Sequence, residues 1–501
     1  MASANDHTPA IQAALATGKP VRLLPGRMRV TSPLICATQG QRIEGHGRAI
    51  SIIMVDAAFQ ASAQGVFVIN TGETAPEFHG FGVSFVQVDT SSLAALTPFP
   101  PAFQVINSAR GRFIDIRILA GMIGINFVGN CGGSTVVRLE SSCLRQNIAI
   151  DGSFDSMRIE GWHVFPTGLT ASQQAIFYSV DCIGLNTGRC DDLKLLDSLF
   201  LCGRAINSYP TTLPVTGGTT GTVSGCAFDT YGNVTVSGGW LQFVGNYFTL
   251  VNGVAAITQT GSCELDISGN RFEIAGGTPS AGYVVQAGSN GADPCILSMS
   301  GNLFDTGSAD VSAVQIVGTA ISVDITGNIF RRSLAGVFGA PALSVGPGGN
   351  GVISGNQFSS PGQGGSGPAM AFAGDASYLV EGNYCGNRAI LTPFQTSVLD
   401  LCDNFALGGA DLVNNNLAGV SRTISLHVIA NATGNSIITH GISDLHKRLL
   451  HLTVLARAAD GSAVPLVAQQ VTPIQIVIAG APANARLRVS FAYSDYIDAW
   501  V

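Results

Sequence analysis

Charged side chains are scarce in this sequence. Asp, Glu, Lys and Arg make up 11% of its 501 residues, and the formal net charge is -7. A nucleic-acid-binding surface needs a dense stripe of Lys and Arg to neutralise phosphates. No such stripe is present, so we expect no nucleic acid among the partners of this chain.

Long apolar runs are missing too. No stretch approaches the ~18 apolar residues that a membrane-spanning helix needs, so we expect no membrane insertion. The first residues, "MASANDHTPAIQAALATG", lack the basic and apolar regions of a secretory signal. We therefore expect synthesis in the cytoplasm without a signal peptide.

Cysteine is present but shows no pattern. The eleven cysteines are scattered, without a Cys-x-x-Cys pair, and the histidines show no metal-ligand spacing. We expect neither a metal nor a cofactor, and we expect the cysteines to lie in the core as free thiols.

Glycine is abundant, with 62 residues, and much of it belongs to a repeat. The segments "WLQFVGNYF", "ELDISGNRF", "CILSMSGNLF", "ISVDITGNIF" and "GVISGNQF" share Gly-Asn-x-Phe behind a short apolar alternation. The repeated asparagines are 24 to 32 residues apart, at positions 246, 270, 302, 328, 356 and 383.

This repeat predicts an all-β fold, a right-handed parallel β-helix. Period-2 alternation is typical of a strand with one buried face, and Gly-Asn forms a turn that accepts positive φ. A unit of this length buries its apolar face only against its neighbours. A β-propeller would show Trp-Asp or four-strand blade patterns, which are absent. We expect the asparagines to stack in one ladder and the phenylalanines to fill the interior.

Weaker copies of the repeat precede the clear ones. Their buried centres are predicted at Val223, Leu195, Ile159, Leu139 and Ile116. The interval from 159 to 195 is too long for one turn of the coil. It predicts a loop that leaves the coil and borders a groove.

The two ends differ from the repeat. "TPAIQAALATG" predicts a short helix, with Thr8 as N-cap and Gly18 as C-cap, covering the open end of the coil. We divide the chain into a cap with the first strands (1–50), the β-helix (51–404) and a β-sandwich-like C-terminal domain (405–501).

The N-terminal segments "VRLLPGRMRV" and "RIEGHG" follow the expected helix. This order resembles the N-terminal cap of the pectate-lyase-like β-helix superfamily, most closely the version in bacteriophage tailspikes. The residues that carry the match are Val21, Leu24, Pro25, Gly26, Val30, Ile43, Gly45 and Gly47. The resemblance implies a homotrimer held by the C-terminal domain, located in the virion tail and attached through a tail adaptor or baseplate protein.

The few charges gather in the early repeats. In our alignment they form outward pairs on successive turns: Asp115 and Arg117, Arg138 and Glu140, Arg158 and Glu160, Asp192 and Lys194. Neighbouring turns of a β-helix lie about 4.8 Å apart. Paired carboxylates at such spacing suit glycoside hydrolysis, whereas an ion-pair ladder would only solubilise the sheet.

We predict catalytic roles for Glu140, Glu160 and Asp192. We expect Arg138, Arg158, Trp162, His163, Lys194 and Asp181 to hold sugars. A lyase would use Arg138, Arg158 or Lys194 to neutralise a uronate, and we favour hydrolysis.

Three functions remain open. The first is a tailspike that recognises and depolymerises a bacterial surface polysaccharide, either capsule or O-antigen. The second is a secreted polysaccharide lyase or hydrolase of the pectinase type, which would need an export signal. The third is a β-helix adhesin that binds glycan without cleaving it.

Overall fold

The computed structural model divides into two compact units, residues 1–250 with 256–258, and residues 251–255 with 259–501. It describes residues 5–60, 63–211, 217–230, 233–250, 255–275, 282–288, 294–307, 309–318, 321–332, 339–359, 368–373, 377–386, 390–391, 398–402, 404–406, 413–414, 422–429, 436–439, 449–458, 462–464, 468–471, 475–479, 481 and 485–493.

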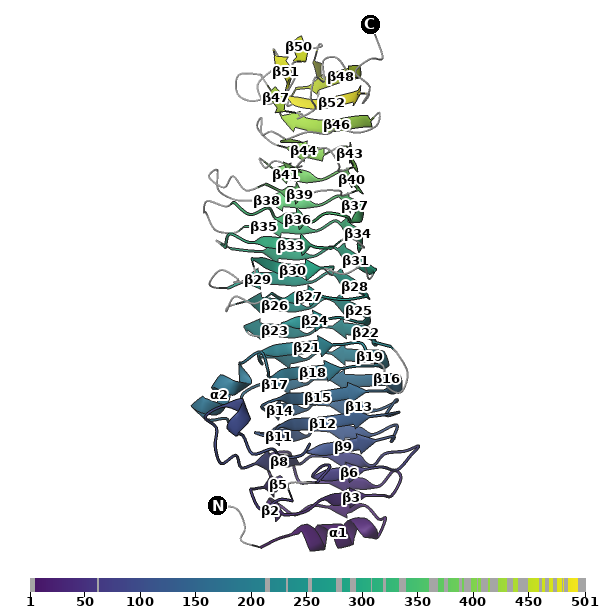
Figure 1. Ribbon diagram of the computed structural model, residues 1–501, viewed down its shortest axis with the longest axis vertical. Coiled ribbons are helices and arrows are strands. Elements are labelled where there is room, and N and C mark those ends of the chain that lie inside the picture. Colours follow the sequence, from purple (N-terminus) through teal and green to yellow (C-terminus); the bar gives the residue numbers. More distant parts are fainter. Residues whose placement is uncertain are drawn as a thin grey trace. The chain divides into compact units, whose positions relative to one another are not determined.

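The first unit is a parallel coil with three strands in each turn (Figure 1). Each strand pairs in parallel with the strand one turn further on, so the backbone groups of short strands are satisfied by their neighbours. Sheet 1 contains β1 (Val21–Arg22), β4 (Arg42–Glu44), β7 (Glu77–His79), β10 (Arg112–Ile114), β13 (Thr135–Val137), β16 (Ser153–Glu160), β19 (Cys190–Leu196), β22 (Thr219–Ser224) and β25 (Gly239–Val244).

The other two sheets of the first unit complete each turn. Sheet 2 contains β2 (Gly26–Val30), β5 (Ser51–Val55), β8 (Gly82–Phe85), β11 (Arg117–Leu119), β14 (Glu140–Ser142), β17 (His163–Val164), β20 (Leu199–Phe200), β23 (Ala227–Thr230) and β26 (Tyr247–Leu250). Sheet 3 contains β3 (Leu34–Cys36), β6 (Phe67–Ile69), β9 (Phe103–Ile106), β12 (Ile123–Val128), β15 (Gln146–Asp151), β18 (Ile183–Thr187), β21 (Arg204–Ser208) and β24 (Val234–Val236). β27 (Ile257–Gln259) begins in the first unit and ends in the second.

The N-terminal helix α1 (Thr8–Ala16) covers the first turn of the coil (Figure 1). The side chain of Gln12 donates to the carbonyl of Ile35 at 3.2 Å and accepts from its N–H at 2.7 Å. Ile35 lies in β3, the first strand of sheet 3. Gln12 of the helix thus satisfies backbone groups at a strand edge that would otherwise be open.

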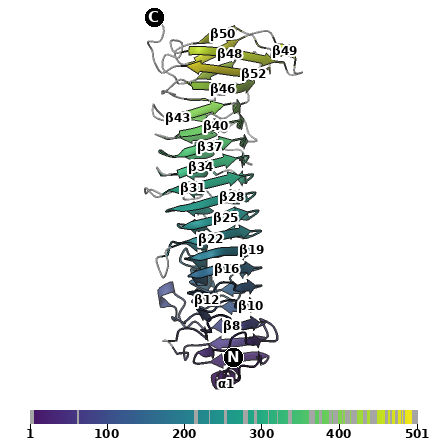
Figure 2. The ribbon, with the colours of Figure 1, turned by 90° about the vertical axis from the view of Figure 1, so that its right-hand side faces the viewer.

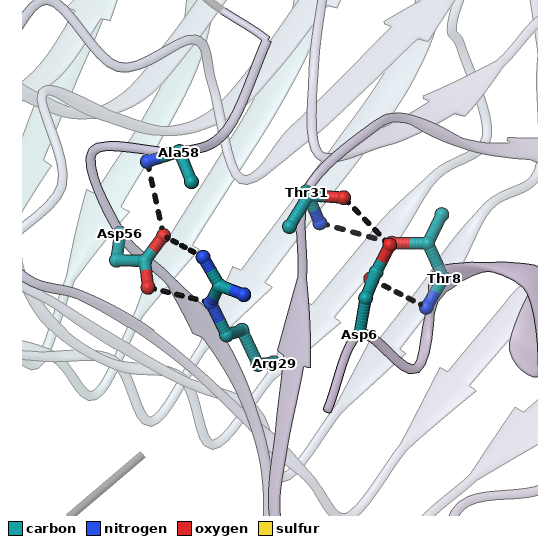
Figure 3. Close-up of polar contacts among 6 residues, drawn as sticks. All are labelled: Asp6, Thr8, Arg29, Thr31, Asp56 and Ala58. Carbon is teal, nitrogen blue, oxygen red and sulfur yellow. Dashed lines mark hydrogen bonds and ion pairs between the residues drawn. The ribbon is translucent and has the colours of Figure 1, made fainter. Parts of the chain in front are cut away.

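The predicted start of α1 is wrong by one residue. The N-cap is His7, and Thr8 is already helical. Asp6 supplies the acceptor instead: its carboxylate accepts from the backbone N–H and the hydroxyl of Thr8 and from the hydroxyl of Thr31 (Figure 3). At the other end the C-cap is Thr17, and Gly18 follows in the left-handed conformation with φ 68°.

A bidentate ion pair fixes the next turn. Arg29 donates from Nε to Asp56 at 2.7 Å, and Asp56 also accepts from the N–H of Ala58 at 3.0 Å (Figure 3). Arg29 on β2 is thereby held to the chain just after β5, the strand with which β2 pairs.

The second unit is also built from turns of three strands, one in each sheet. Sheet 1 contains β28 (Cys263–Ser268), β31 (Cys295–Ser300), β34 (Ile321–Thr326), β37 (Asn350–Ser354), β40 (Ser377–Glu381) and β43 (Val398–Cys402). Sheet 2 contains β29 (Arg271–Ile274), β32 (Leu303–Asp305), β35 (Ile329–Arg331), β38 (Gln357–Ser359), β41 (Tyr384–Gly386) and β44 (Asn404–Ala406). Sheet 3 contains β30 (Tyr283–Ala287), β33 (Ser312–Ile316), β36 (Leu343–Val345), β39 (Met370–Phe372), β42 (Ile390–Leu391) and β45 (Val413–Asn414).

The predicted asparagine ladder is confirmed in this unit. The N–H groups of Asn270, Asn302, Asn328 and Asn356 each donate to the Oδ1 of the next asparagine at 2.9–3.0 Å. The last acceptor is Asn383, and the side-chain amides also bond to one another at 2.8–3.0 Å. In the first unit Asn246 has the same role, because its Oδ1 accepts from the N–H of a cysteine at 2.9 Å.

The phenylalanines of the repeat fill the interior, as predicted. Phe272, Phe304, Phe330 and Phe358 are buried, and successive rings stack with centroids 4.6–5.2 Å apart. Phe228 and Phe248 stack in the same way in the first unit, at 4.4 Å.

The end of the second unit is antiparallel. β46 (Arg422–Ile429) pairs in parallel with β44, and β52 (Arg486–Tyr493) runs antiparallel to β46. The remaining strands also pair antiparallel, namely β48 (Leu449–Arg457) with β49 (Ala463–Val464) and β52, and β51 (Gln475–Ala479) with β47 (Ser436–Thr439) and β50 (Ala468–Val471). In the described part of the chain, no helix has the length and apolarity to cross a membrane.

Candidate functional site

Four of the predicted charged residues, Asp115, Arg117, Arg138 and Glu140, lie around one corner of the first unit, between sheets 1 and 2. β16 and β19, strands of sheet 1 at this corner, face the viewer in Figure 2. The register differs from the sequence alignment. Phe113, Val136, Ile159 and Leu195 share one buried column of sheet 1, so Leu139 is not the equivalent of Ile159.

Two of the predicted charged pairs, Asp115 with Arg117 and Arg138 with Glu140, therefore extend across the corner instead of lying within one strand. Asp115 and Arg138 are the corner residues themselves, with left-handed φ of 56° and 53°. Later turns have glycine at this corner, as at Gly161 and Gly225, except for Asp197 with φ 48°. The predicted stack of four charged pairs on one face is thus wrong, because Glu140 belongs to sheet 2 and Glu160 to sheet 1.

Glu140 is the centre of a cluster of charges, which we call the corner cluster. Arg117 donates to its carboxylate at 2.7 Å, and the Nε of Arg48 lies 3.5 Å away. Arg48 also lies 3.6 Å from Asp115 and donates to the carbonyl of Arg138 at 3.3 Å. The corner cluster comprises Arg48, Asp115, Arg117, Arg138 and Glu140.

Glu140 stays ionised within this cluster. Burial pushes the pKa of its carboxyl upward, since its side chain is only 11% exposed. Hydrogen bonds from Arg117 and Thr167 and the charges of Arg117 and Arg48 outweigh burial, so the pKa lies below the ordinary value. Such a carboxylate suits a nucleophile, a base or a cation stabiliser better than a proton donor.

The other two predicted carboxylates each pair within their own strand. Glu160 accepts from Arg158 at 2.6 Å on β16, and Asp192 contacts Lys194 at 2.8 Å on β19. All four side chains are more than a third exposed, so these ion pairs contribute little to stability.

Trp162 cannot stack on a sugar, contrary to the prediction. It is fully buried, its indole N–H donates to the hydroxyl of Ser141 at 2.8 Å, and its ring packs edge-on against Phe200 at 5.1 Å. Its backbone N–H donates to the hydroxyl of Ser198, one turn further on. In the asparagine ladder, the N–H of each asparagine likewise donates to the side chain of the next one. Trp162 is therefore a core residue of the corner. His163 is exposed on β17, in register with Glu140.

A lobe projects from the turn between sheets 2 and 3. The predicted loop forms it in part: residues 165–182 leave the coil and contain α2 (Ala171–Phe177), which a capping box begins at Thr170. Residues 86–100 form the rest, with a short 3₁₀ helix at Leu93–Ala95. The two segments meet through the hydroxyls of Thr90 and Ser172, 2.7 Å apart. The lobe adjoins β8, β11 and β14 (Figure 1).

A groove of about 520 Å³, which we call the lobe groove, lies between the lobe and the starts of the sheet 3 strands. Asp181, predicted to hold sugars, lies in its wall. The sequence did not single out Arg145 and Arg204, which lie in the same wall, because their positions follow different turns of the coil. The lining residues are Leu93, Ala94, Met122, Arg145, Gln146, Val180, Asp181, Ile183 and Arg204.

A second groove of about 520 Å³, the turn groove, crosses the turns from sheet 3 to sheet 1. It contains two carboxylates, Glu73 and Asp155, together with Arg110, and none of the three has an ion-pair partner within the described residues. Arg110 and Asn107 have left-handed φ of 60° and 45°. Neither groove is lined by Glu140, Glu160 or Asp192.

The described residues contain no group of three or more His, Cys, Asp or Glu side chains that could hold a metal ion. Ten of the eleven cysteines are free and buried, as expected, and the side chain of Cys402 lies outside the described residues. Burial raises the pKa of the Cys36 thiol to about 12, so such thiols are poor nucleophiles and poor metal ligands.

Comparison with known proteins shows that this chain is similar to solved structures but not to known sequences. No protein-family model matches the chain, and no curated protein sequence matches it. The tailspike protein of E. coli bacteriophage HK620, as a double mutant in which an aspartate and a glutamate are replaced, matches with a TM-score of 0.53 at 11% identity. The same tailspike in complex with a pentasaccharide matches with a TM-score of 0.50 at 11% identity. Each comparison covers 98% of this chain and 90% of that one. The chain therefore has the parallel β-helix fold of these phage tailspike proteins.

Proposed function

We propose that this protein is a phage tailspike, a trimeric receptor-binding protein that recognises and hydrolyses a bacterial surface polysaccharide. The observation that carries the proposal is the lobe groove, an open cleft on the flank of a tailspike-like β-helix, with aliphatic and charged walls. A long polysaccharide needs such an open surface, because several sugars must bind on both sides of the cleaved bond.

The proposal places the protein in the virion tail, joined to a tail adaptor or baseplate protein. Its ligand is the capsule or O-antigen of the host. The pentasaccharide complex of the similar tailspike supports a carbohydrate ligand, and the apolar residues on the outer surface support subunit contacts.

The candidate carboxylates remain Glu140, Glu160 and Asp192, to which the groove adds Asp181. Glu140 is the best candidate for the ionised partner, because Arg117 keeps its pKa low. Thr167 links its carboxylate to the lobe segment, which brings Glu140 to the base of the lobe. Hydrolysis also needs a second carboxyl that donates a proton to the glycosidic oxygen.

Single substitutions test these roles. Glu140→Gln, Glu160→Gln, Asp192→Asn and Asp181→Asn each remove one titrating group with little change in shape. Loss of an acid or base should slow depolymerisation of host capsule or O-antigen by on the order of 10²- to 10⁴-fold while glycan binding persists. Unchanged cleavage by all four would move the active site elsewhere, and the Glu73 and Asp155 pair of the turn groove is the next to test.

The products separate the alternatives. New reducing ends without ultraviolet absorbance of an unsaturated uronate support hydrolysis, and that absorbance would indicate a lyase. Binding without any new ends on any host polysaccharide would make the protein an adhesin.

A further inference from the structure

The lobe groove holds basic side chains that the protein itself does not neutralise. Most arginines of the first unit lie within 4.0 Å of a carboxylate, as Arg117 and Arg158 do. Arg145 and Arg204 have no such partner among the described residues, although Asp181 lies in the same wall. In a chain of net charge -7, two unpaired arginines in one cleft indicate a ligand of opposite charge.

Arg204 is also short of hydrogen bonds. Its Nη1 donates to the side chain of Asn207 at 3.3 Å, whereas its Nε is buried with no partner in the described structure. This Nε is out of reach of a ligand in the groove, so a carboxylate there must bind through the Nη atoms. Arg is suited to such planar groups because it donates two parallel hydrogen bonds.

The remaining wall suits a sugar ring. Leu93, Met122, Val180 and Ile183 present aliphatic surface, and Gln146 presents a donor and an acceptor. A pyranose has apolar C–H faces and a rim of hydroxyls, which matches such a mixture. A volume of about 520 Å³ lies within the 300–1,000 Å³ range of ordinary ligand sites.

The charge balance favours a ligand with one negative charge. Arg145 and Arg204 contribute two positive charges and Asp181 one negative charge, which leaves one net positive charge in the groove. A sugar carboxylate neutralises it, whereas a dianionic phosphate monoester would exceed it and would also be repelled by Asp181.

We propose that the lobe groove is a subsite for an acidic sugar, in which Arg145 and Arg204 bind one carboxylate and Asp181 accepts hydrogen bonds from hydroxyls. The proposal deepens the proposed function and rests on it for the ligand being a polysaccharide. It places the substrate among glycans that contain a uronic acid or another sugar with a single carboxylate.

The test uses the full-length chain and simple sugars as probes. Glucuronate, galacturonate and N-acetylneuraminate are compared with glucose and with glucose 6-sulfate by saturation-transfer NMR and by titration. At least one carboxylated sugar should bind, roughly 10- to 100-fold more tightly than the neutral sugar, and more weakly as salt is added. Equal binding of glucose, binding of the sulfate ester alone, or no binding of any carboxylated sugar would overturn the proposal.

Variants assign the binding to the groove. Arg145→Ala and Arg204→Gln should each reduce the affinity by roughly 10-fold or more, and Arg145→Lys should lose less because the charge remains. Arg112→Ala is the matched control, since Arg112 is exposed on sheet 1 and lies 3.5 Å from Glu77. Thermal unfolding of each variant shows whether it is folded. Folded Arg145→Ala and Arg204→Gln proteins with wild-type affinity would contradict the proposal.

The two proposals fail in different ways. If no polysaccharide is cleaved but binding of the carboxylated sugar depends on Arg145 and Arg204, the hydrolase is wrong and the acidic subsite stands. If host polysaccharide is cleaved equally before and after reduction of its carboxyl groups, the hydrolase stands and the acidic subsite is wrong.

Discussion

At the scale of single residues, the asparagine of the repeat is the clearest link between sequence and stability. The Oδ1 of Asn328 accepts from the N–H and the side chain of Asn302, and its amide donates to the carbonyl of Met299 at 3.0 Å. All these atoms are buried. The asparagine therefore satisfies backbone groups of the turn before it.

Replacing Asn328 tests this role. Asn328→Ala leaves the N–H of Asn302 without an acceptor, and a buried unsatisfied group costs about 1–3 kcal/mol. We expect a loss of at least that size in urea unfolding. The exposed Ser300→Ala, at the end of β31 one turn before Asn328, should change stability by less than about 0.5 kcal/mol. Equal effects of the two substitutions would contradict the ladder.

Arg138, with φ 53°, occupies a corner where most later turns have glycine, as at Gly161 and Gly225. The left-handed conformation costs a residue with a Cβ about 1–2 kcal/mol. Glycine avoids this cost, but it loses more backbone entropy on folding, which offsets part of the gain. We expect Arg138→Gly to be about 0.5–1 kcal/mol more stable than Arg138→Ala, measured by thermal unfolding. Both variants lack the Arg138 side chain, whose Nε lies 4.0 Å from Asp115. They differ chiefly in the backbone, so a less stable glycine variant would exclude strain at this corner.

Glu140 should make stability depend on pH. Its pKa is lower in the folded state than the ordinary value of about 4.3. The stabilisation is therefore present above about pH 4.3 and is lost as pH falls through the folded pKa. We expect Glu140→Gln to be less stable than wild type at pH 7, with a difference that shrinks as pH falls below 4. Glu160→Gln, which removes only an exposed ion pair, should show little difference at either pH.

The residues that were predictable are those that the corner requires in every turn. Gly-Asn-x-Phe supplies the left-handed residue, the ladder amide and the buried ring, so the pattern predicts all three places. Trp162 occupies the ladder position without being an asparagine. The sugar-binding role was predicted from its closeness to Glu160, but the corner between the two strands turns the ring inward. For the same reason, the sequence alignment matched Leu139 with Ile159, whereas Val136 is the residue that pairs with Ile159.

At the scale of elements, strands were easier to predict than the segments between them. The long interval before Leu195 predicted one loop of the lobe, whereas residues 86–100 gave no signal because the turn before them lacks the repeat. The lobe groove combines residues from turns far apart in sequence, such as Leu93 and Arg204. No spacing rule links such residues until the register of the coil is known.

The contact between α1 and β3 can be tested at this scale. Gln12→Ala removes both solvent-exposed hydrogen bonds to Ile35, and we expect a loss of about 1 kcal/mol with greater self-association through the freed strand edge. Gln12→Glu keeps the acceptor and loses the donor, so it should fall between wild type and alanine. Unchanged unfolding and unchanged light scattering in Gln12→Ala would show that the helix does not protect the edge.

At the scale of the whole molecule, the scarcity of charged side chains is relevant to how copies of the chain assemble. Both units expose large apolar side chains, among them Trp240 (37% exposed) and Tyr247 (39%) in the first and Ile296 (47%) in the second. Aromatic residues are enriched at protein interfaces, and charged residues are depleted at their centres. These side chains therefore support contacts with further copies of the chain.

We predict a homotrimer, the assembly that the tailspike resemblance implies, and three parallel copies would cover such side chains by symmetry. Sedimentation of the full-length chain at micromolar concentration should give three times the monomer mass. Ile296→Ser and Trp240→Ser each replace an exposed apolar side chain by a polar one, so they should not reduce monomer folding but should weaken association. Loss of association in these variants, with unchanged circular dichroism, would assign the contact to those surfaces. A stable monomer would contradict the trimer.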